Sequence, residues 1–129
     1  RMRIEGDYMD KKILVVDDAM FMRSIIRKIL KEDGYTQVWE AQDGEKAMEL
    51  FREVSPDLVL LDITMPGRSG LEVLEEMLSL VPNIRVIMCS AVGQEMMIQK
   101  ALTIGAADFI VKPFKADEFS RIVNRCLEQ

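Results

Sequence analysis

The stretch Leu58-Val59-Leu60-Leu61-Asp62 is an unbroken apolar run that ends in a single aspartate. A short run of this kind is typical of a parallel β-strand that is covered on both faces. A carboxylate rarely follows such a run by chance, because burying a charge is costly unless a partner compensates for it. The stretch therefore predicts a central strand with a functional carboxylate at its carboxyl end.

Two further segments show the same pattern. Residues 13–16 are all apolar and run into Asp17 and Asp18, and the apolar residues 109–111 run into Lys112. Parallel strands that lie side by side end at the same edge of a sheet, so three carboxylates and one ammonium group would meet there. This combination indicates a site for a divalent metal ion and a phosphoryl group.

Strand-like and helical patterns alternate five times along the chain. The expected strands are residues 12–17, 37–41, 58–62, 85–90 and 108–111. Apolar residues at helical spacing predict helices over about residues 21–34, 43–54, 69–82, 94–104 and 115–127. In the first helix, the face turned toward the core is expected to comprise Phe21, Ile25, Ile26, Ile29 and Leu30.

Repeated βα units of this kind form a doubly wound α/β fold with right-handed crossovers. We expect a five-stranded parallel sheet of the flavodoxin-like (βα)5 type, with the strand order 2-1-3-4-5. In that order the winding direction changes between the first and third strands, and ligands bind beyond the strand ends at this point. Asp17, Asp18 and Asp62 stand at the ends of these two strands.

Size and composition limit the class of protein. The 129 residues suffice for one domain, which we place at residues 11–129 after a polar arm of residues 1–10. The net charge of -5 argues against general binding to nucleic acids, and no apolar run approaches the ~20 residues of a membrane span. Cys89 and Cys126 fit no metal-binding pattern and are expected to be buried free thiols. No signal peptide is visible, so we expect a cytoplasmic protein without membrane insertion.

Three neighbouring carboxylates repel one another and raise each other's pKa. A hard divalent cation removes this conflict, and Mg²⁺ suits the site because it binds a few carboxylate oxygens together with water and phosphate oxygens. The competing interpretation is that each aspartate caps a helix or forms a turn. That interpretation is favoured for any single residue, whereas the metal site is favoured for Asp17, Asp18 and Asp62 together.

Asp62 is the best candidate for a phosphoacceptor. A carboxylate can attack phosphorus to give an aspartyl phosphate, and Asp62 stands alone at the centre of the sheet, before a loop. Lys112 would supply a cation for the phosphoryl oxygens, and Ser90 would supply a hydroxyl donor from the fourth strand. Taken singly, Lys112 is an ordinary strand end and Ser90 an ordinary turn residue. The sequence contains no histidine, so chemistry that needs one must come from a partner.

Four short blocks carry a resemblance to a known family. They are residues 15–18 (Val-Val-Asp-Asp), residues 62–66 (Asp-Ile-Thr-Met-Pro) with Gly70, residues 89–91 (Cys-Ser-Ala) and residues 112–114 (Lys-Pro-Phe). In this order between residues 11 and 127, they resemble the receiver domain of two-component response regulators. The resemblance is closest to the stand-alone chemotaxis members of that family.

The resemblance implies a set of roles around the acidic cluster. Asp62 would be the phosphoacceptor, and Asp17, Asp18, Asp62 and the backbone carbonyl of Thr64 would bind Mg²⁺. Thr64 and Val92 match two positions that tune hydrolysis in the family. Neither is acidic or an amide, so we expect no water-positioning side chain there and slow self-dephosphorylation.

The resemblance also implies how the phosphoryl group is detected. Ser90 matches the hydroxyl switch position, Ala91 beside it is small enough to admit the phosphoryl group, and Lys112 would bind that group. Phe109 matches an aromatic switch residue of the family, and the alternative for it is an ordinary core aromatic. The bond between Lys112 and Pro113 is commonly cis in the family.

By the same resemblance, the chain is a phosphorylation-dependent switch rather than an enzyme, and it catalyses only its own phosphorylation and slow dephosphorylation. A histidine kinase would donate the phosphoryl group. A downstream protein would bind the face formed by the fourth helix, fifth strand and fifth helix, and in chemotaxis members that protein is a flagellar motor switch component. The alternative is a receiver cut from a larger regulator with a DNA-binding or enzymatic output domain. The lack of a linker after Leu127 favours the stand-alone form.

Other protein classes fit the sequence less well. A flavodoxin needs a phosphate loop rich in Ser, Thr and Gly after the first strand, where this chain has Asp17-Asp18. An aspartyl-phosphate phosphatase needs an Asp-x-Asp pattern at the same place. A P-loop nucleotidase needs the pattern GxxxxGK[ST], which the sequence does not contain.

Overall fold

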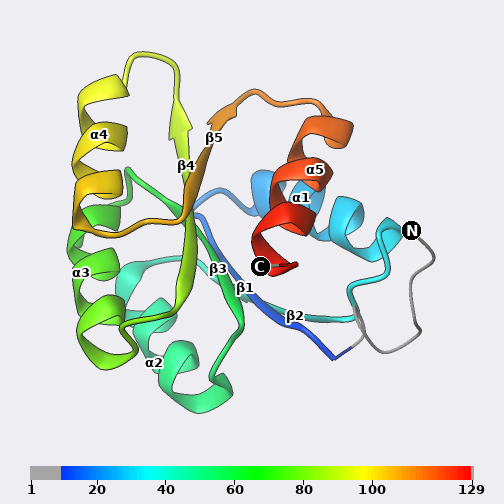
Figure 1. Cartoon of the computed structure of the whole chain (residues 1–129), viewed down its shortest axis with the longest axis horizontal. Helices are drawn as coiled ribbons and strands as arrows, with labels where there is room; N and C mark the ends of the chain where they lie inside the picture. The colour runs from blue at the N-terminus through cyan, green and yellow to red at the C-terminus, as the bar shows by residue number, and fades with distance from the viewer. Residues whose placement is uncertain (1–9, 129) are drawn as a thin grey trace.

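A computed structural model describes residues 10–128 and shows five βα units in succession (Figure 1). The strands pair in parallel in the order β2-β1-β3-β4-β5, which confirms the predicted fold class and strand order. Residues 1–9 of the expected arm lie outside the described residues, as does residue 129. The strands are β1 (Lys12–Val16), β2 (Gln37–Ala41), β3 (Leu58–Asp62), β4 (Arg85–Ala91) and β5 (Asp108–Lys112).

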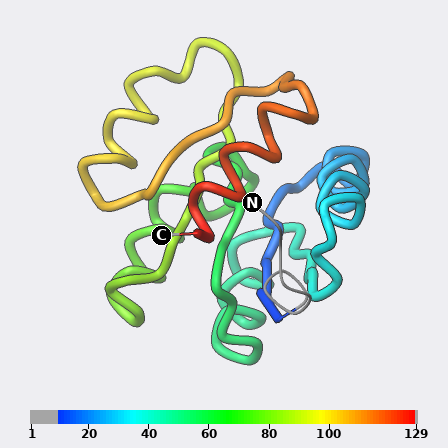
Figure 2. Tube along the Cα trace, turned by 45° about the vertical axis from the view of Figure 1, so that its right-hand side comes forward, coloured from blue at the N-terminus to red at the C-terminus, as the bar shows by residue number. Residues whose placement is uncertain are grey.

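The helices cover the sheet on both faces, with α1 and α5 on one side and α2, α3 and α4 on the other (Figures 1 and 2). Side chains of β1 alternate between the two layers: Leu14 and Val16 face α2 and α3, and Ile13 and Val15 face α1 and α5. Burial on both faces is the reason for the continuous apolar runs in the sequence. The helices are α1 (Met20–Glu32), α2 (Gly44–Val54), α3 (Gly70–Leu80), α4 (Glu95–Ile104) and α5 (Ala116–Leu127).

The expected core face of the first helix is wrong at one position. Phe21 is 77% exposed, whereas Met22 and Ile26 pack against the core. Successive helical residues point about 100° apart, so a face that begins at Met22 and continues through Ile26 turns Phe21 away from it. Phe21, in the first turn of α1, therefore lies outside the core face of the helix.

Two other expectations concern the chain as a whole. Cys89 and Cys126 are both buried and free, as predicted. Within residues 10–128, no helix is both long enough and apolar enough to cross a membrane.

Candidate functional site

The acidic residues meet at the carboxyl edge of the sheet because β1 and β3 are neighbours. Asp62 is the last residue of β3, and Asp17 and Asp18 follow β1 directly. Each of the three residues has a carboxylate oxygen within 4.8 Å of the oxygens of the other two. The topology inferred from the sequence thus correctly places all three at the switch point of the fold.

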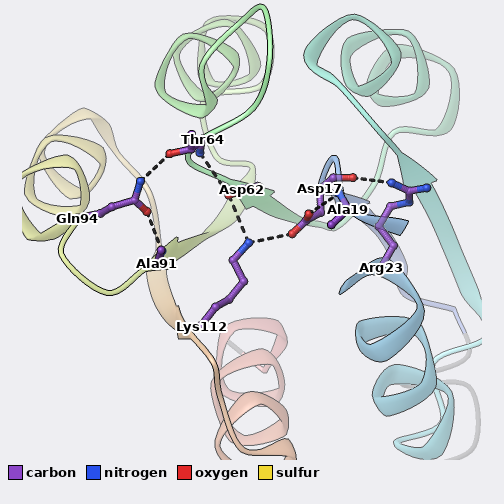
Figure 3. A network of polar contacts seen from close by, with 8 residues as sticks. All are labelled: Asp17, Ala19, Arg23, Asp62, Thr64, Ala91, Gln94 and Lys112. Carbon is purple, nitrogen blue, oxygen red and sulfur yellow. Dashed lines mark hydrogen bonds and ion pairs between the residues drawn. The ribbon is translucent and has the colours of Figure 1, made fainter. Parts of the chain in front are cut away.

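Lys112 reaches this cluster from β5, across the intervening strand β4 (Figure 3). Its ammonium Nζ lies 3.0 Å from Asp17 Oδ2 and 3.5 Å from Asp62 Oδ1. The strand register sets Lys112 beside Ala91, and the lysine side chain extends from there to the aspartates that follow β1 and end β3. The peptide bond that follows, to Pro113, is cis, as the resemblance implied.

Asp17 belongs to the acidic cluster and also forms hydrogen bonds that shape the turn before α1. Its Oδ1 accepts a hydrogen bond from the Ala19 backbone N–H at 2.9 Å, just before α1 begins. The Arg23 guanidinium donates to the Asp17 carbonyl oxygen at 2.7 Å (Figure 3). It also donates to Glu40 Oε1 on β2 at 3.0 Å. The turn-forming interpretation is therefore correct for one oxygen of Asp17, while the other oxygen binds Lys112.

The loop after Asp62 folds back tightly on the end of β3. Gly70 donates its backbone N–H to the Ile63 carbonyl at 2.8 Å, where α3 begins. A Cβ atom on Gly70 would lie 2.2 Å from the Asp62 carbonyl oxygen, which is a severe clash with the backbone. Only glycine permits this approach, so Gly70 fixes the path of the loop that carries Thr64.

Asp62 is 5% exposed, and its burial raises the pKa of its carboxyl group from 3.8 to about 6. The Lys112 charge and the Thr64 backbone N–H, which donates to Asp62 Oδ1 at 3.3 Å, oppose this shift, while the Asp17 charge adds to it. A bound cation would favour the ionised form further. Without one, the folded protein holds a proton on Asp62 more tightly than the unfolded chain does.

Burial by itself would lower the pKa of Lys112, but the hydrogen bond to Asp17 and the charges of Asp62 and Asp17 outweigh this effect. The pKa of Lys112 is therefore raised, and its ammonium stays charged at neutral pH. Cys89, which pairs with Asp62 in the sheet register, has its pKa raised to about 12 by burial. Its thiol is not ionised at neutral pH, so it is a poor nucleophile.

The buried Asp62 carboxylate leads to a pH-dependent prediction for the metal-free protein. Because the pKa is higher in the folded state, the stability that Asp62 contributes is complete below pH 3.8 and is lost as the pH rises through about 6. Asp62→Asn carries no charge, so we expect the variant to be more stable than the wild type at pH 7 by up to about 3 kcal/mol. Chemical unfolding in the presence of a chelator measures this difference.

The same comparison at pH 4 is its control, because Asp62 is then mostly protonated in the folded protein and the gain should largely disappear. A variant that is less stable than the wild type at pH 7 would contradict the electrostatic account of this site.

Ser90 is fully buried in β4, and its hydroxyl oxygen has no hydrogen-bond partner among the described residues. Buried polar groups are usually satisfied, so an unpartnered hydroxyl beside a cluster of charges calls for an explanation. The next two residues, Ala91 and Val92, are exposed to solvent, and the side chain of Val92 is 76% exposed. The Ser90 hydroxyl is therefore a buried donor that lies one residue from the exposed end of β4.

Phe109 lies on β5 and is 36% exposed, so the alternative that it is an ordinary core aromatic is wrong. The neighbouring Ile110 occupies the buried position, and alternation along a strand turns Phe109 to the opposite face. Phe109 is therefore a partly exposed residue of β5 and not part of the core.

Sequence reasoning missed Gln94. Its amide Nε2 donates to the Thr64 hydroxyl at 2.6 Å, and its Oε1 accepts from the Ala91 backbone N–H at 2.7 Å (Figure 3). An amide does adjoin the site, although Thr64 and Val92 themselves carry none. The sequence signal was weak, because Gln94 reaches Thr64 only through the turn at Gly93, where φ is +96°.

The donor set suits a hard divalent cation. Three carboxylates supply oxygen ligands, and their mutual repulsion is only partly offset by the single charge of Lys112. Together with the doubly wound sheet, this defines an α/β protein with an acidic site at its switch point that could hold a divalent cation.

Comparison with known proteins agrees with this class. A family profile described as the response regulator receiver domain matches residues 13–124. The chain is 48% identical to chemotaxis protein CheY of Bacillus subtilis (strain 168), over 92% of this chain and 99% of that protein. It is 39% identical to sporulation initiation phosphotransferase F of the same organism, over 92% of this chain and 95% of that protein.

A solved receiver-domain structure is also similar to this chain. The crystal structure of the receiver domain of NtrX from Brucella abortus matches with a TM-score of 0.87 at 37% identity, covering 92% of this chain and 99% of that one. The chain belongs to the response regulator receiver domain family. Receiver domains are phosphorylation-dependent signalling switches rather than classical enzymes.

Proposed function

We propose that this receiver accepts a phosphoryl group on Asp62, with Mg²⁺ bound by Asp17, Asp18, Asp62 and the backbone carbonyl of Thr64. The observation that carries the proposal is a buried carboxylate, Asp62, in a cluster with two further carboxylates and with a protonated lysine that contacts both Asp62 and Asp17. Oxygen ligands of this kind suit Mg²⁺, which also accepts phosphate oxygens.

In the proposed reaction, an oxygen of Asp62 attacks the phosphorus of a phosphohistidine on a histidine kinase. The new P–O bond forms as the P–N bond breaks, and the leaving histidine takes a proton to become neutral imidazole. Lys112 would neutralise the phosphoryl oxygens from its place 3.5 Å from Asp62 Oδ1. When bound, Mg²⁺ would neutralise further charge on the same oxygens.

The proposed switch begins at Ser90. A phosphoryl group on Asp62 would offer strong acceptor oxygens to the unpartnered Ser90 hydroxyl, beside the small Ala91. An inward move of Ser90 would leave space for Phe109 and so change the face formed by α4, β5 and α5. Met96 on α4, 78% exposed, offers an adaptable apolar contact on that face.

We propose that the output is of the chemotaxis type, in which the phosphorylated form binds a flagellar motor switch component. The support is the similarity to chemotaxis protein CheY of Bacillus subtilis (strain 168) over almost the whole length of both chains. Thr64 and Val92 would tune the lifetime of the phosphorylated form. The alternative output, through a DNA-binding or enzymatic domain of a larger regulator, is tested by binding to the motor component.

Incubation with a small phosphodonor, such as acetyl phosphate, tests the phosphorylation itself. We expect the protein to gain one phosphoryl group in the presence of Mg²⁺ and essentially none with a chelator, as read by intact-protein mass. Equal uptake under both conditions would contradict the role of the metal, and no uptake under either would contradict the proposed function.

A further inference from the structure

The amide side chain of Gln94 lies beside the acidic cluster and bridges two neighbouring segments (Figure 3). It links Thr64, in the loop that follows β3, to Ala91, the last residue of β4 (Figure 3). We name this pair of hydrogen bonds the Gln94 strap. Both bonds are short, at 2.6 and 2.7 Å, and they use the amide oxygen and the amide nitrogen of one side chain.

The strap joins the two loops that must respond to a phosphoryl group. Thr64 is two residues from Asp62, and its backbone N–H donates to the Asp62 carboxylate. Ala91 directly follows Ser90, whose buried hydroxyl has no partner among the described residues. While the strap is closed, the backbone at Ala91 is held at a set distance from the loop that carries Thr64.

An unpartnered buried hydroxyl is costly, so other contacts must stabilise the arrangement that leaves Ser90 in this state. The strap is such a contact, because it acts on the residue next to Ser90. If Ser90 moves toward a phosphoryl group on Asp62, Ala91 moves with it, and the bond from the Ala91 N–H to Gln94 lengthens or breaks. The closed strap and the phosphoryl-bound position of Ser90 therefore compete.

We propose that Gln94 is a positioning residue that holds the β3–α3 and β4–α4 loops in the unphosphorylated arrangement, and that phosphoryl uptake on Asp62 requires release of its strap. This inference rests on the proposed function. It goes further by assigning to Gln94 a control over how readily Asp62 is phosphorylated.

The first test replaces the amide with an apolar side chain of similar length. Gln94→Met cannot form the strap, so we expect the initial rate of phosphoryl uptake from acetyl phosphate to rise roughly three- to tenfold, as the loss of one or two hydrogen bonds would give. Gln99→Met makes the same change on the exposed surface of α4 and should leave the rate unchanged. Intact-protein mass at early times, with Mg²⁺ present, measures all three rates.

A second variant breaks the strap from its other end. Thr64→Val removes the hydroxyl that accepts from Gln94 and should raise the rate by a similar factor, whereas Thr64→Ser keeps a hydroxyl and should lie closer to the wild type. Because both changes break the same connection, the double variant Gln94→Met with Thr64→Val should be no faster than either single variant. Amide hydrogen exchange at Ala91 should be faster in both single variants than in the wild type.

The outcomes separate the two proposals. A wild type that takes up no phosphoryl group overturns the proposed function, and the strap with it. A wild type that is phosphorylated while Gln94→Met and Thr64→Val react no faster overturns the strap alone. If both single variants react faster and the double variant shows the product of the two increases, the strap is also overturned, because the two side chains would then act separately. Either single variant suffices for the test if the other fails to fold.

Discussion

Replacing Asp62 with alanine is expected to abolish phosphoryl uptake. Asp62 carries the carboxylate that lies at the end of the central strand, 3.5 Å from the Lys112 ammonium. Without it, the site has lost the only group in the proposed reaction that forms a bond to phosphorus. Intact-protein mass after incubation with acetyl phosphate and Mg²⁺ should show no added phosphoryl group on the variant, at any time at which the wild type is labelled.

A matched aspartate change tests whether the loss is specific. Asp117 is exposed in the first turn of α5 and accepts a hydrogen bond from the Glu118 backbone N–H. Asp117→Ala should be labelled like the wild type. Equal labelling of Asp62→Ala and the wild type would refute the assignment of the phosphoacceptor. Labelling that moves to Asp17 or Asp18 in the variant would show that Asp62 is not the only nucleophile of the cluster.

Replacing Lys112 with methionine is expected to lower the initial rate of phosphoryl uptake by about a hundredfold or more, the usual effect of removing one preorganised charge-stabilising group. The Lys112 ammonium is held 3.0 Å from Asp17 and stays protonated, so it needs no rearrangement to meet the incoming charge. Methionine keeps most of the length and apolar character of the side chain but removes the charge. The rate is measured with saturating Mg²⁺, so that weaker metal binding does not account for the loss.

Lys115 provides the control for the lysine change. It is exposed, precedes α5, and its side chain makes no capping hydrogen bond. Lys115→Met should react at the rate of the wild type. If Lys112→Met also reacted at that rate, the cation at the end of β5 would have no part in phosphoryl transfer, and its ion pairs with the aspartates would be structural only.

The amino-acid sequence by itself determined the architecture and most members of the site. Runs such as residues 58–62 are typical of strands buried on both faces, and five βα repeats with right-handed crossovers leave few topologies. Once the order 2-1-3-4-5 is accepted, Asp17, Asp18 and Asp62 must share one edge of the sheet. These inferences succeed because strand periodicity and crossover handedness are local properties of the chain.

Features that depend on the path of a side chain or a loop were decided only by the tertiary structure. The exposure of Phe21 follows from the exact rotation of α1 over the sheet, which apolar spacing alone does not define. Gln94 meets Thr64 across 30 residues of sequence because a turn at Gly93 brings two loops together. No pattern in the sequence marks such a contact.

The electrostatic state of the site also required the folded structure. The residue types predict a cluster of carboxylates and a lysine, but the raised pKa of Asp62 follows first from its burial and only then from its neighbours. The reach of Lys112 over β4 depends on the register that sets it beside Ala91. The sequence thus determined which charged groups would meet at the end of β3, and the tertiary structure decided how deeply they are buried and which of them touch, because burial and contact depend on the packing of the whole fold.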